Sequence, residues 1–382
     1  MKIIYDNAMP YADEFFSDLG VAESFTAGEL RTDQLRDVDA LFVRSTTKVD
    51  GQLLSEATSL RFVATATAGF NHLDTSLLKE RGIKWYAAGG CNAVAVAEYV
   101  LNAIYHLAKQ DGFIPQDKTV AIVGAGNVGS AVAKRLRILG ISCALYDPPL
   151  EKSGDPRAFV SFDSVMQADV ICLHTPLVDE GESPTRDMFE LSRLSQLKKS
   201  QYLINACRGE VVNNQDLLSL FEQGRALNIV LDVWEHEPLI EKRLIPYLRL
   251  ATAHIAGHSI EGKARGTSMV YDAFCAFSGT PVTKQLSDYL PIDNRVIALD
   301  SKEDSFHQVF HMLKHMYDIE KDDGNFRSRM AKSEAFAEIR QNYPQRRECS
   351  AAKVHFNGAQ SETNNNKTMV STAAALGFLI AN

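Results

Sequence analysis

A glycine-rich run is the first part of this sequence whose residue types and spacing suit a specific chemistry. The run Gly124-Ala125-Gly126-Asn127-Val128-Gly129 has GxGxxG spacing. It follows the apolar segment Thr119–Val123 and precedes a helical pattern, which is the context of a dinucleotide-binding loop. The first glycine permits a tight turn, the second lets a pyrophosphate approach the backbone, and the third lets helix and strand pack closely. We predict cofactor contacts from Gly124, Gly126, Asn127, Val128 and Gly129.

Asp147 identifies the type of dinucleotide. It ends the next predicted strand, about twenty residues after the loop, where a carboxylate can accept hydrogen bonds from ribose hydroxyls. A carboxylate at this position repels a 2′-phosphate, and the residues that follow are Pro148 and Pro149 rather than arginine. We therefore predict NAD rather than NADP as the cofactor.

Three later polar segments carry the residue types that hydride transfer requires. They are Asn205–Glu210, Asp232–Pro238 and His254–His258, and each follows a predicted strand. A histidine carries a proton near neutral pH. An arginine binds a carboxylate through two hydrogen bonds and polarises a neighbouring carbonyl. A carboxylate that touches the histidine fixes its orientation. With a dinucleotide nearby, these groups suit oxidation or reduction of a 2-hydroxy acid.

Each of these residues also has a simpler structural interpretation. Arg208 would then be a surface side chain after a strand, Glu237 a helix-capping acid, and His254 a hydrogen-bonded core residue. Their joint occurrence after successive strands favours the catalytic interpretation.

The elements that must position these groups follow a repeated strand–helix rhythm. Apolar strand-like segments occur at 2–5, 40–43, 60–64 and 83–86, with helical patterns between them. A long helix is predicted over 92–108, and the rhythm then restarts with strands at 119–123, 142–147, 169–174, 201–205, 229–232 and 248–251. This order predicts an α/β protein with two doubly wound parallel sheets. Ligands bind at the carboxyl ends of such strands.

Composition excludes several other classes of protein. The chain has 382 residues, a net charge of -8 and six scattered cysteines without a CxxC pair. These features argue against a nucleic-acid-binding protein and against a disulfide scaffold. The N-terminus lacks a signal-peptide pattern, and no apolar stretch reaches the ~18 residues of a membrane helix. We predict a cytoplasmic protein with no nucleic-acid or membrane partner.

The order of the motifs resembles that of a known enzyme family. GAGNVG, NACRG, LDVWEHEP and HIAG occur as in the D-2-hydroxyacid dehydrogenases, and the resemblance covers about residues 1–285. It implies that Arg208 binds substrate and that Glu237 pairs with His254, the proton donor and acceptor. It also implies cofactor-lining roles for Thr175, Ala206, Asp232 and Gly257.

Further segments resemble one branch of that family. RSTTKV at 44–49, TATAG at 65–69, GCNA at 90–93 and EGKARGT at 261–267 are similar to the enzymes that oxidise 4-phospho-D-erythronate in bacterial vitamin B6 (pyridoxal 5′-phosphate) synthesis. This implies substrate contacts from Ser45, Thr67 and His258, the last at a position where the branch usually has tyrosine. Arg44 adds a positive charge for an anion, although a solvated polar loop explains the same residues.

The strand–helix rhythm stops after residue 286. A strand-like segment at 295–299, an amphipathic helix at 305–319 and polar stretches follow, and this pattern predicts a smaller α+β domain. The resemblance implies a substrate domain at 1–96 and 256–286, an NAD-binding domain at 97–255, and a C-terminal dimerisation domain at 287–382. The run YPQRRE at 343–348 also resembles that branch. Its two arginines suggest the hypothesis that Arg346 or Arg347 supplies a further cation to substrate across a homodimer interface.

Two alternatives remain open from the sequence. One is another dehydrogenase of the same family, for example one that oxidises phosphoglycerate. The other is an NAD-sensing protein that acts through partners. His307, His311 and His315 recur every fourth residue, which is metal-ligand spacing, but a metal site needs more varied ligands and supporting contacts. We predict no metal.

Overall fold

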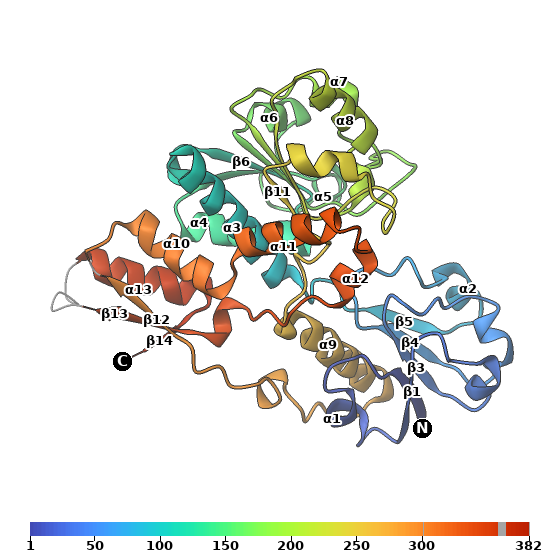
Figure 1. Ribbon diagram of the computed structural model, residues 1–382. Coiled ribbons are helices and arrows are strands. Elements are labelled where there is room, and N and C mark those ends of the chain that lie inside the picture. The colour runs from blue at the N-terminus through green and yellow to red at the C-terminus, as the bar shows by residue number, and fades with distance from the viewer. Residues whose placement is uncertain (301, 358–363, 382) are drawn as a thin grey trace. The chain divides into compact units, whose positions relative to one another are not determined.

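The computed structural model describes residues 1–300, 302–357 and 364–381, and the chain folds into two compact units (Figure 1). One unit comprises Met1–Asn92 and His258–Ile292, and the other comprises Ala93–Gly257 and Asp293–Asn382. Each contains a parallel sheet with helices, which confirms the predicted α/β class. The functional division of the chain at residues 96, 255 and 286 stays a prediction.

The first unit has a five-stranded parallel sheet. Its strands, in spatial order, are β2 (Val21–Phe25), β1 (Lys2–Asp6), β3 (Ala40–Val43), β4 (Phe62–Thr65) and β5 (Lys84–Ala87). Its α-helices are α1 (Ala12–Phe16), α2 (Thr75–Glu80) and α9 (Ile260–Ser278). Phe274 of α9 packs against Phe42 and Phe62 on one face of the sheet. Leu78 of α2 belongs to a separate core that contains Val63.

The sequence predicted every strand of this sheet except β2. This strand lies at the sheet edge beside β1, and four of its five residues are exposed or half-buried. Because an edge strand with one buried residue lacks an apolar run, the hydrophobic pattern gives no signal there.

The second unit is built on a six-stranded parallel sheet. Its strands, in spatial order, are β11 (Leu250–Ala251), β10 (Asn228–Leu231), β9 (Tyr202–Asn205), β8 (Val170–Leu173), β6 (Thr119–Val123) and β7 (Ser142–Tyr146). Its helices before residue 258 are α3 (Ala93–Asp111), α4 (Asn127–Ile138), α5 (Pro148–Lys152), α6 (Phe162–Gln167), α7 (Leu191–Leu194) and α8 (Asn214–Glu222). From β6 the chain first continues to β7 on one side, and the later strands β8 to β11 then follow on the other side. The strand order therefore reverses at β6, and open α/β sheets bind ligands at such a switch point.

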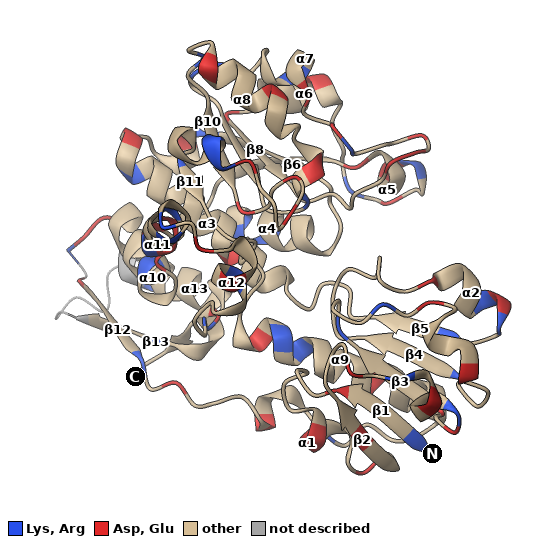
Figure 2. Ribbon diagram, turned by 45° about the vertical axis from the view of Figure 1, so that its right-hand side comes forward, with Lys and Arg blue, Asp and Glu red and all other residues tan. Residues whose placement is uncertain are grey.

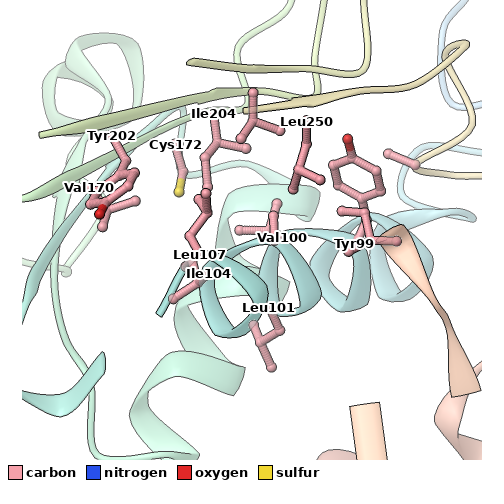
Figure 3. Packing of buried hydrophobic residues seen from close by; sticks show 14 of the residues in the cluster. Tyr99, Val100, Leu101, Ile104, Leu107, Val170, Cys172, Tyr202, Ile204 and Leu250 are labelled. Carbon is pink, nitrogen blue, oxygen red and sulfur yellow. The ribbon is translucent and has the colours of Figure 1, made fainter. Parts of the chain in front are cut away.

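Helix α3 lies at the centre of this unit. Figure 3 shows Val100, Ile104 and Leu107 pointing toward the strands that carry Cys172 and Ile204, while Leu101 points to the opposite side. Almost the whole helix is buried, because it packs on the sheet and also against α4, α10 and α11. A helix in such a position is expected to be mostly apolar, and α3 also buries the polar side chains Glu98, Asn102 and His106.

The C-terminal part adds a three-stranded parallel sheet to the same unit. Its strands are β12 (Val296–Asp300), β13 (Lys353–Asn357) and β14 (Leu379–Ile380), in that order. Its helices are α10 (Ser305–Met316), α11 (Ile319–Ala331), α12 (Phe336–Gln341) and α13 (Asn364–Leu376). The apolar core continues from the six-stranded sheet into these helices. The predicted smaller α+β region is thereby confirmed.

Charged residues are interspersed along the helices of both units (Figure 2). Within the described ranges, no helix has both the length and the apolar character needed to cross a membrane.

Candidate active site

The glycine-rich loop has the backbone geometry of a dinucleotide cradle. Gly124 follows β6 with φ +90, and a Cβ atom there would lie 2.7 Å from the carbonyl of His174. A Cβ atom on Gly129 would lie 2.0 Å from the carbonyl oxygen of Gly124. Gly126, at the N-cap of α4, faces open space instead. The loop therefore packs tightly where two glycines are needed and leaves room where a pyrophosphate would lie.

Asp147 forms the rim of this loop. One carboxylate oxygen accepts a hydrogen bond from the Ala125 amide at 2.8 Å, and the other caps α5 through the Leu150 amide at 3.1 Å. The carboxylate is thus fixed beside the loop, as its predicted ribose contact requires.

Two residues near the loop were missed by sequence reasoning. The Arg157 guanidinium donates to the Ala125 carbonyl at 2.9 Å and pairs with Asp155 at 2.8 Å, which lowers the pKa of Asp155 to about 2. His174 follows β8, and burial lowers its pKa to about 3. Neither ring nitrogen of His174 has a hydrogen-bond partner among the described residues. Buried polar groups are normally paired, so an orphan beside the loop fits a site that a ligand completes.

The predicted histidine–carboxylate pair is present at the carboxyl ends of β10 and β11. His254 Nδ1 lies 2.8 Å from Glu237 Oε2, and Glu237 Oε1 accepts a hydrogen bond from the Trp234 amide at 3.0 Å. The His254 side chain is 29% exposed and that of Glu237 is 20% exposed. With Nδ1–H donated to the carboxylate, Nε2 is the nitrogen that can take up a proton.

Arg208 follows β9, the strand next to β10. The Asn205 side chain bridges this turn, because its Nδ2 donates to the Arg208 carbonyl at 2.9 Å and its Oδ1 accepts from the Cys207 amide at 3.2 Å. A Cβ atom on Gly209 would lie 1.9 Å from the Trp234 backbone. This close approach brings the arginine segment against the segment that carries Glu237.

Asp232 is buried beneath the turn that carries His254. Its carboxylate accepts hydrogen bonds from the Thr252 hydroxyl at 2.6 Å, the Ile255 amide at 2.8 Å and the Ala256 amide at 2.9 Å. His254 itself has a left-handed φ of 56, which local contacts must hold in place. Asp232 therefore shapes the turn, and its predicted contact with nicotinamide stays a prediction.

The remaining cofactor-lining predictions also fall in this second unit. Thr175 follows His174, and its hydroxyl lies 3.9 Å from the Cys207 sulfur. Ala206 lies between Asn205 and Cys207, and Gly257 follows Ala256, three residues after His254. The structure thus groups these positions with the loop and the catalytic residues.

The predicted substrate-binding residues lie in the first unit. Arg44 and Ser45 follow β3, and Thr67 follows β4, so the structure brings them to one edge of that sheet. The Thr67 hydroxyl lies 2.7 Å from that of Thr65 and donates to the Gly69 carbonyl at 2.9 Å. His258 precedes α9. Their contacts with substrate stay predictions.

The hypothesis that Arg346 or Arg347 supplies a cation to substrate stays a prediction, and the structure places Arg346 among groups of its own chain. The guanidinium is buried and donates to the carbonyls of Ala95 at 2.8 Å and Ala256 at 2.6 Å. Arg347 faces Asp293 at 3.8 Å. The hydrogen-bond partners of Arg346 Nη2 are backbone carbonyls, and no side-chain pattern in the sequence identifies such partners.

The histidine row on α10 has separate partners. His307 lies 2.9 Å from Asp304, His311 lies 3.1 Å from Glu303, and His315 Nδ1 lies 2.8 Å from the His311 carbonyl. Among the residues that the structure describes, no three metal-ligating side chains gather in one place.

Comparison with known proteins gives two family matches. Residues 98–258 match the NAD-binding domain of the D-isomer specific 2-hydroxyacid dehydrogenases. Residues 291–369 match a domain of unknown function. The cofactor loop and the catalytic segments all lie within the first of these matches.

Curated relatives match almost the whole chain. The erythronate-4-phosphate dehydrogenase of Pseudoalteromonas atlantica is 48% identical, over 93% of this chain and 95% of its own length. That of Klebsiella pneumoniae is 44% identical, over 95% and 96%. Among solved structures, NAD⁺-bound 3-phosphoglycerate dehydrogenase of Entamoeba histolytica covers 74% of this chain and 97% of its own, with a TM-score of 0.61 and 22% identity. The last comparison shows a shared fold.

Proposed function

Since this chain belongs to the erythronate-4-phosphate dehydrogenase family, we propose that it oxidises 4-phospho-D-erythronate to 2-oxo-3-hydroxy-4-phosphobutanoate with NAD⁺. The observation that carries this proposal is the His254–Glu237 pair, at 2.8 Å, at the carboxyl edge of the sheet that bears the cofactor loop. The physiological role that follows is a step in pyridoxal 5′-phosphate synthesis.

His254 acts as the base in the oxidation. Its Nε2 takes the proton of the C2 hydroxyl, while Nδ1–H stays hydrogen-bonded to Glu237. The Glu237 carboxylate stabilises the imidazolium that forms, and the Trp234 amide keeps that carboxylate oriented. Bound NAD⁺ supplies the hydride acceptor.

Arg208 binds the substrate carboxylate and polarises the oxygen on C2. A guanidinium is suited to this because it donates two parallel hydrogen bonds. The Asn205 bridge fixes the backbone on both sides of Arg208. The side chain is half-buried, so part of it remains accessible to a ligand.

Residues of the first unit supply the specificity for a phosphorylated substrate. Arg44 carries the charge, and Ser45, Thr67 and His258 carry hydrogen-bonding groups. Binding energy from a phosphate remote from C2 can position the reacting carbon, so it contributes to turnover as well as to affinity.

We propose that the enzyme works as a cytoplasmic homodimer assembled through its C-terminal sheet. Val296, Lys353 and Leu379 are paired neighbours across the three strands and therefore share one face. Val296 is 55% exposed and Leu379 is 50% exposed. This face thus carries two exposed apolar side chains on either side of Lys353, and their burial in a protein–protein contact supports the proposal. Light scattering of the wild type and of a Val296→Lys/Leu379→Lys variant tests it: the wild type should have twice the mass of the variant.

An assay of NADH fluorescence tests the proposed reaction. Purified protein and NAD⁺ should yield NADH with 4-phospho-D-erythronate, but not with 3-phosphoglycerate or lactate. Turnover of 3-phosphoglycerate instead would favour the other dehydrogenase activity. NADH binding without turnover of any of the three acids would favour an NAD-sensing protein.

A further inference from the structure

We propose that the C-terminal region of each chain is part of its own catalytic machinery, with Arg346 as the residue that positions the turn of His254. This inference rests on the proposed function, because the position of the turn matters for turnover only if His254 transfers the proton. It concerns residues 252–256, called the catalytic turn below, and the region after Asp293 that packs against it within the second unit.

Arg346 connects the catalytic turn to helix α3. Its Nη2 donates to the Ala256 carbonyl at 2.6 Å and to the Ala95 carbonyl at 2.8 Å. The guanidinium also lies 4.3 Å from the centre of the Tyr317 ring. The residue is only 6% exposed. Nη2 therefore lies between two carbonyls and can fix that of Ala256, while the buried Nε and Nη1 have no hydrogen-bond partner among the described residues.

Two further side chains of the C-terminal region contact this segment. Arg340 of α12 donates through Nε to the His254 carbonyl at 3.3 Å. Asp323 of α11 accepts a hydrogen bond from the Ala251 amide, directly before the turn, at 2.7 Å. The C-terminal region thus contacts the backbone before the turn, at its histidine and at its end.

The catalytic turn is therefore held from two sides by different chemistry. Asp232, from the sheet, accepts from the amides of Ile255 and Ala256. Arg346, from the C-terminal region, donates to the Ala256 carbonyl. Because residue 256 is fixed at both its amide and its carbonyl, the peptide plane that precedes the cofactor-lining Gly257 cannot rotate without breaking a charged hydrogen bond.

Packing and hydrogen bonds both hold the turn. Ala253, Ile255 and Ala256 belong to the buried core. A partly open pocket of about 250 Å³ is lined by Thr252, Ala253 and Ile255 and by residues of the C-terminal helices such as Phe326 and Ile339. The hydrogen bonds from Arg346 and Arg340 add directional restraint at two carbonyls of the turn. Misplacement of a catalytic group by about 1 Å can reduce turnover about 10²-fold.

A matched pair of variants separates positioning from stability. Arg346→Met removes the clamp on the turn. Arg193→Met removes an arginine of the same unit that donates to the Met188 carbonyl at 2.6 Å and lies 4.4 Å from the centre of the Phe162 ring, outside the turn. We expect both to lower Tm, but only Arg346→Met to lower kcat by about 30–100-fold, with the NADH Kd and the substrate KM within about threefold of wild type.

Arg346→Lys keeps the charge and one donor to a carbonyl. It should recover part of the lost kcat, and Arg193→Lys is its control. If the methionine variant does not fold, we expect the same difference in kcat between the two lysine variants. Equal kcat for the Arg346 and Arg193 variants would overturn the inference, as would a kcat loss that merely follows the fraction of folded protein.

Amide hydrogen exchange provides a readout that needs no substrate. Exchange in a peptide covering the catalytic turn should rise at least about tenfold in the Arg346 variants and stay unchanged in the Arg193 variants. Unchanged exchange in both would reject the clamp. A wild-type enzyme without activity on 4-phospho-D-erythronate would instead reject the proposed function, so the two failures are distinguishable.

Discussion

The cofactor loop and the catalytic turn both lie at the carboxyl edge of the six-stranded sheet, but they are held in different ways. Asp147 contacts the loop from 22 positions away, and the third glycine of the loop packs against the first. The catalytic turn depends on Asp232, which precedes it, and on Arg346, which lies 90 positions beyond Ala256. The loop is thus a local structure, whereas the turn requires a distant part of the chain.

Because the two structures are held by different residues, we expect variants of the loop and variants of the turn to change different measured quantities. Damage to the loop should weaken cofactor binding and leave kcat at saturating NAD⁺ nearly unchanged. Damage to the turn should lower kcat and leave cofactor binding intact. The following predictions test this separation, beginning with the variant of largest expected effect.

His254→Ala removes the base. General acid–base catalysis by one side chain contributes about 10²–10⁴-fold, so we expect kcat to fall about 10³-fold. NADH affinity, measured by fluorescence titration, should stay within about twofold of wild type, because His254 pairs with Glu237 rather than with the loop. Normal turnover in this variant would remove His254 from the mechanism.

Asp232→Asn removes one acceptor beneath the turn and introduces an amide N–H near backbone donors. A buried donor left without a partner costs about 1–3 kcal/mol. We expect kcat to fall about 10²-fold, since a misplaced catalytic group has an effect of that size. The unfolding free energy, measured in urea, should fall by about 1–3 kcal/mol. A loss of stability with full kcat would show that the turn tolerates displacement.

Asp147→Ala tests the other side of the comparison. It removes the acceptor for the Ala125 and Leu150 amides and the predicted ribose contact. Hydrogen bonds to charged groups contribute about 1.5–3 kcal/mol, so NADH affinity should fall at least about tenfold. At saturating NAD⁺ we expect kcat within about twofold of wild type. A large kcat defect would mean that the two structures are coupled.

Glu98→Gln concerns the contact between α3 and the C-terminal region. Burial and the nearby charge of Glu348 raise the pKa of Glu98 to about 7, and Glu98 accepts a hydrogen bond from the Cys349 amide at 3.0 Å. A raised carboxyl pKa stabilises the fold below pH ~4.5, and this stabilisation is lost as the pH rises through about 7.

The neutral glutamine should therefore be more stable than glutamate at pH 8, by about 1–3 kcal/mol, with a smaller difference at pH 5. Thermal unfolding at the two pH values measures this. A gain in stability of the same size at both would exclude ionisation of Glu98 as its cause.

Much of the fold and of the cofactor site could be predicted because their signals are local. The loop, Asp147 and the long central helix appear as continuous patterns, and that helix spans Ala93–Asp111 in the structure. Strand β2 was not predicted, because it lies at the sheet edge and its mostly exposed residues give no apolar run. His174 was missed because a histidine after a strand looks like any other polar strand end.

Arg346 shows the main limit of the sequence. A charged residue beside Arg347 suggested a surface or ligand-binding role. The groups that its Nη2 contacts are the carbonyls of Ala95 and Ala256, at positions far away along the chain. Every residue has a carbonyl group, so only the fold reveals which carbonyls surround a guanidinium.

The central claim is direct hydride transfer from C2 of 4-phospho-D-erythronate to NAD⁺, with only the hydroxyl proton passing to His254. Oxidation of substrate deuterated at C2, followed by mass spectrometry of the reduced cofactor, tests it most directly. We predict one deuterium atom per NADH formed and none in the solvent. Unlabelled NADH, with the deuterium released to water, would contradict the account.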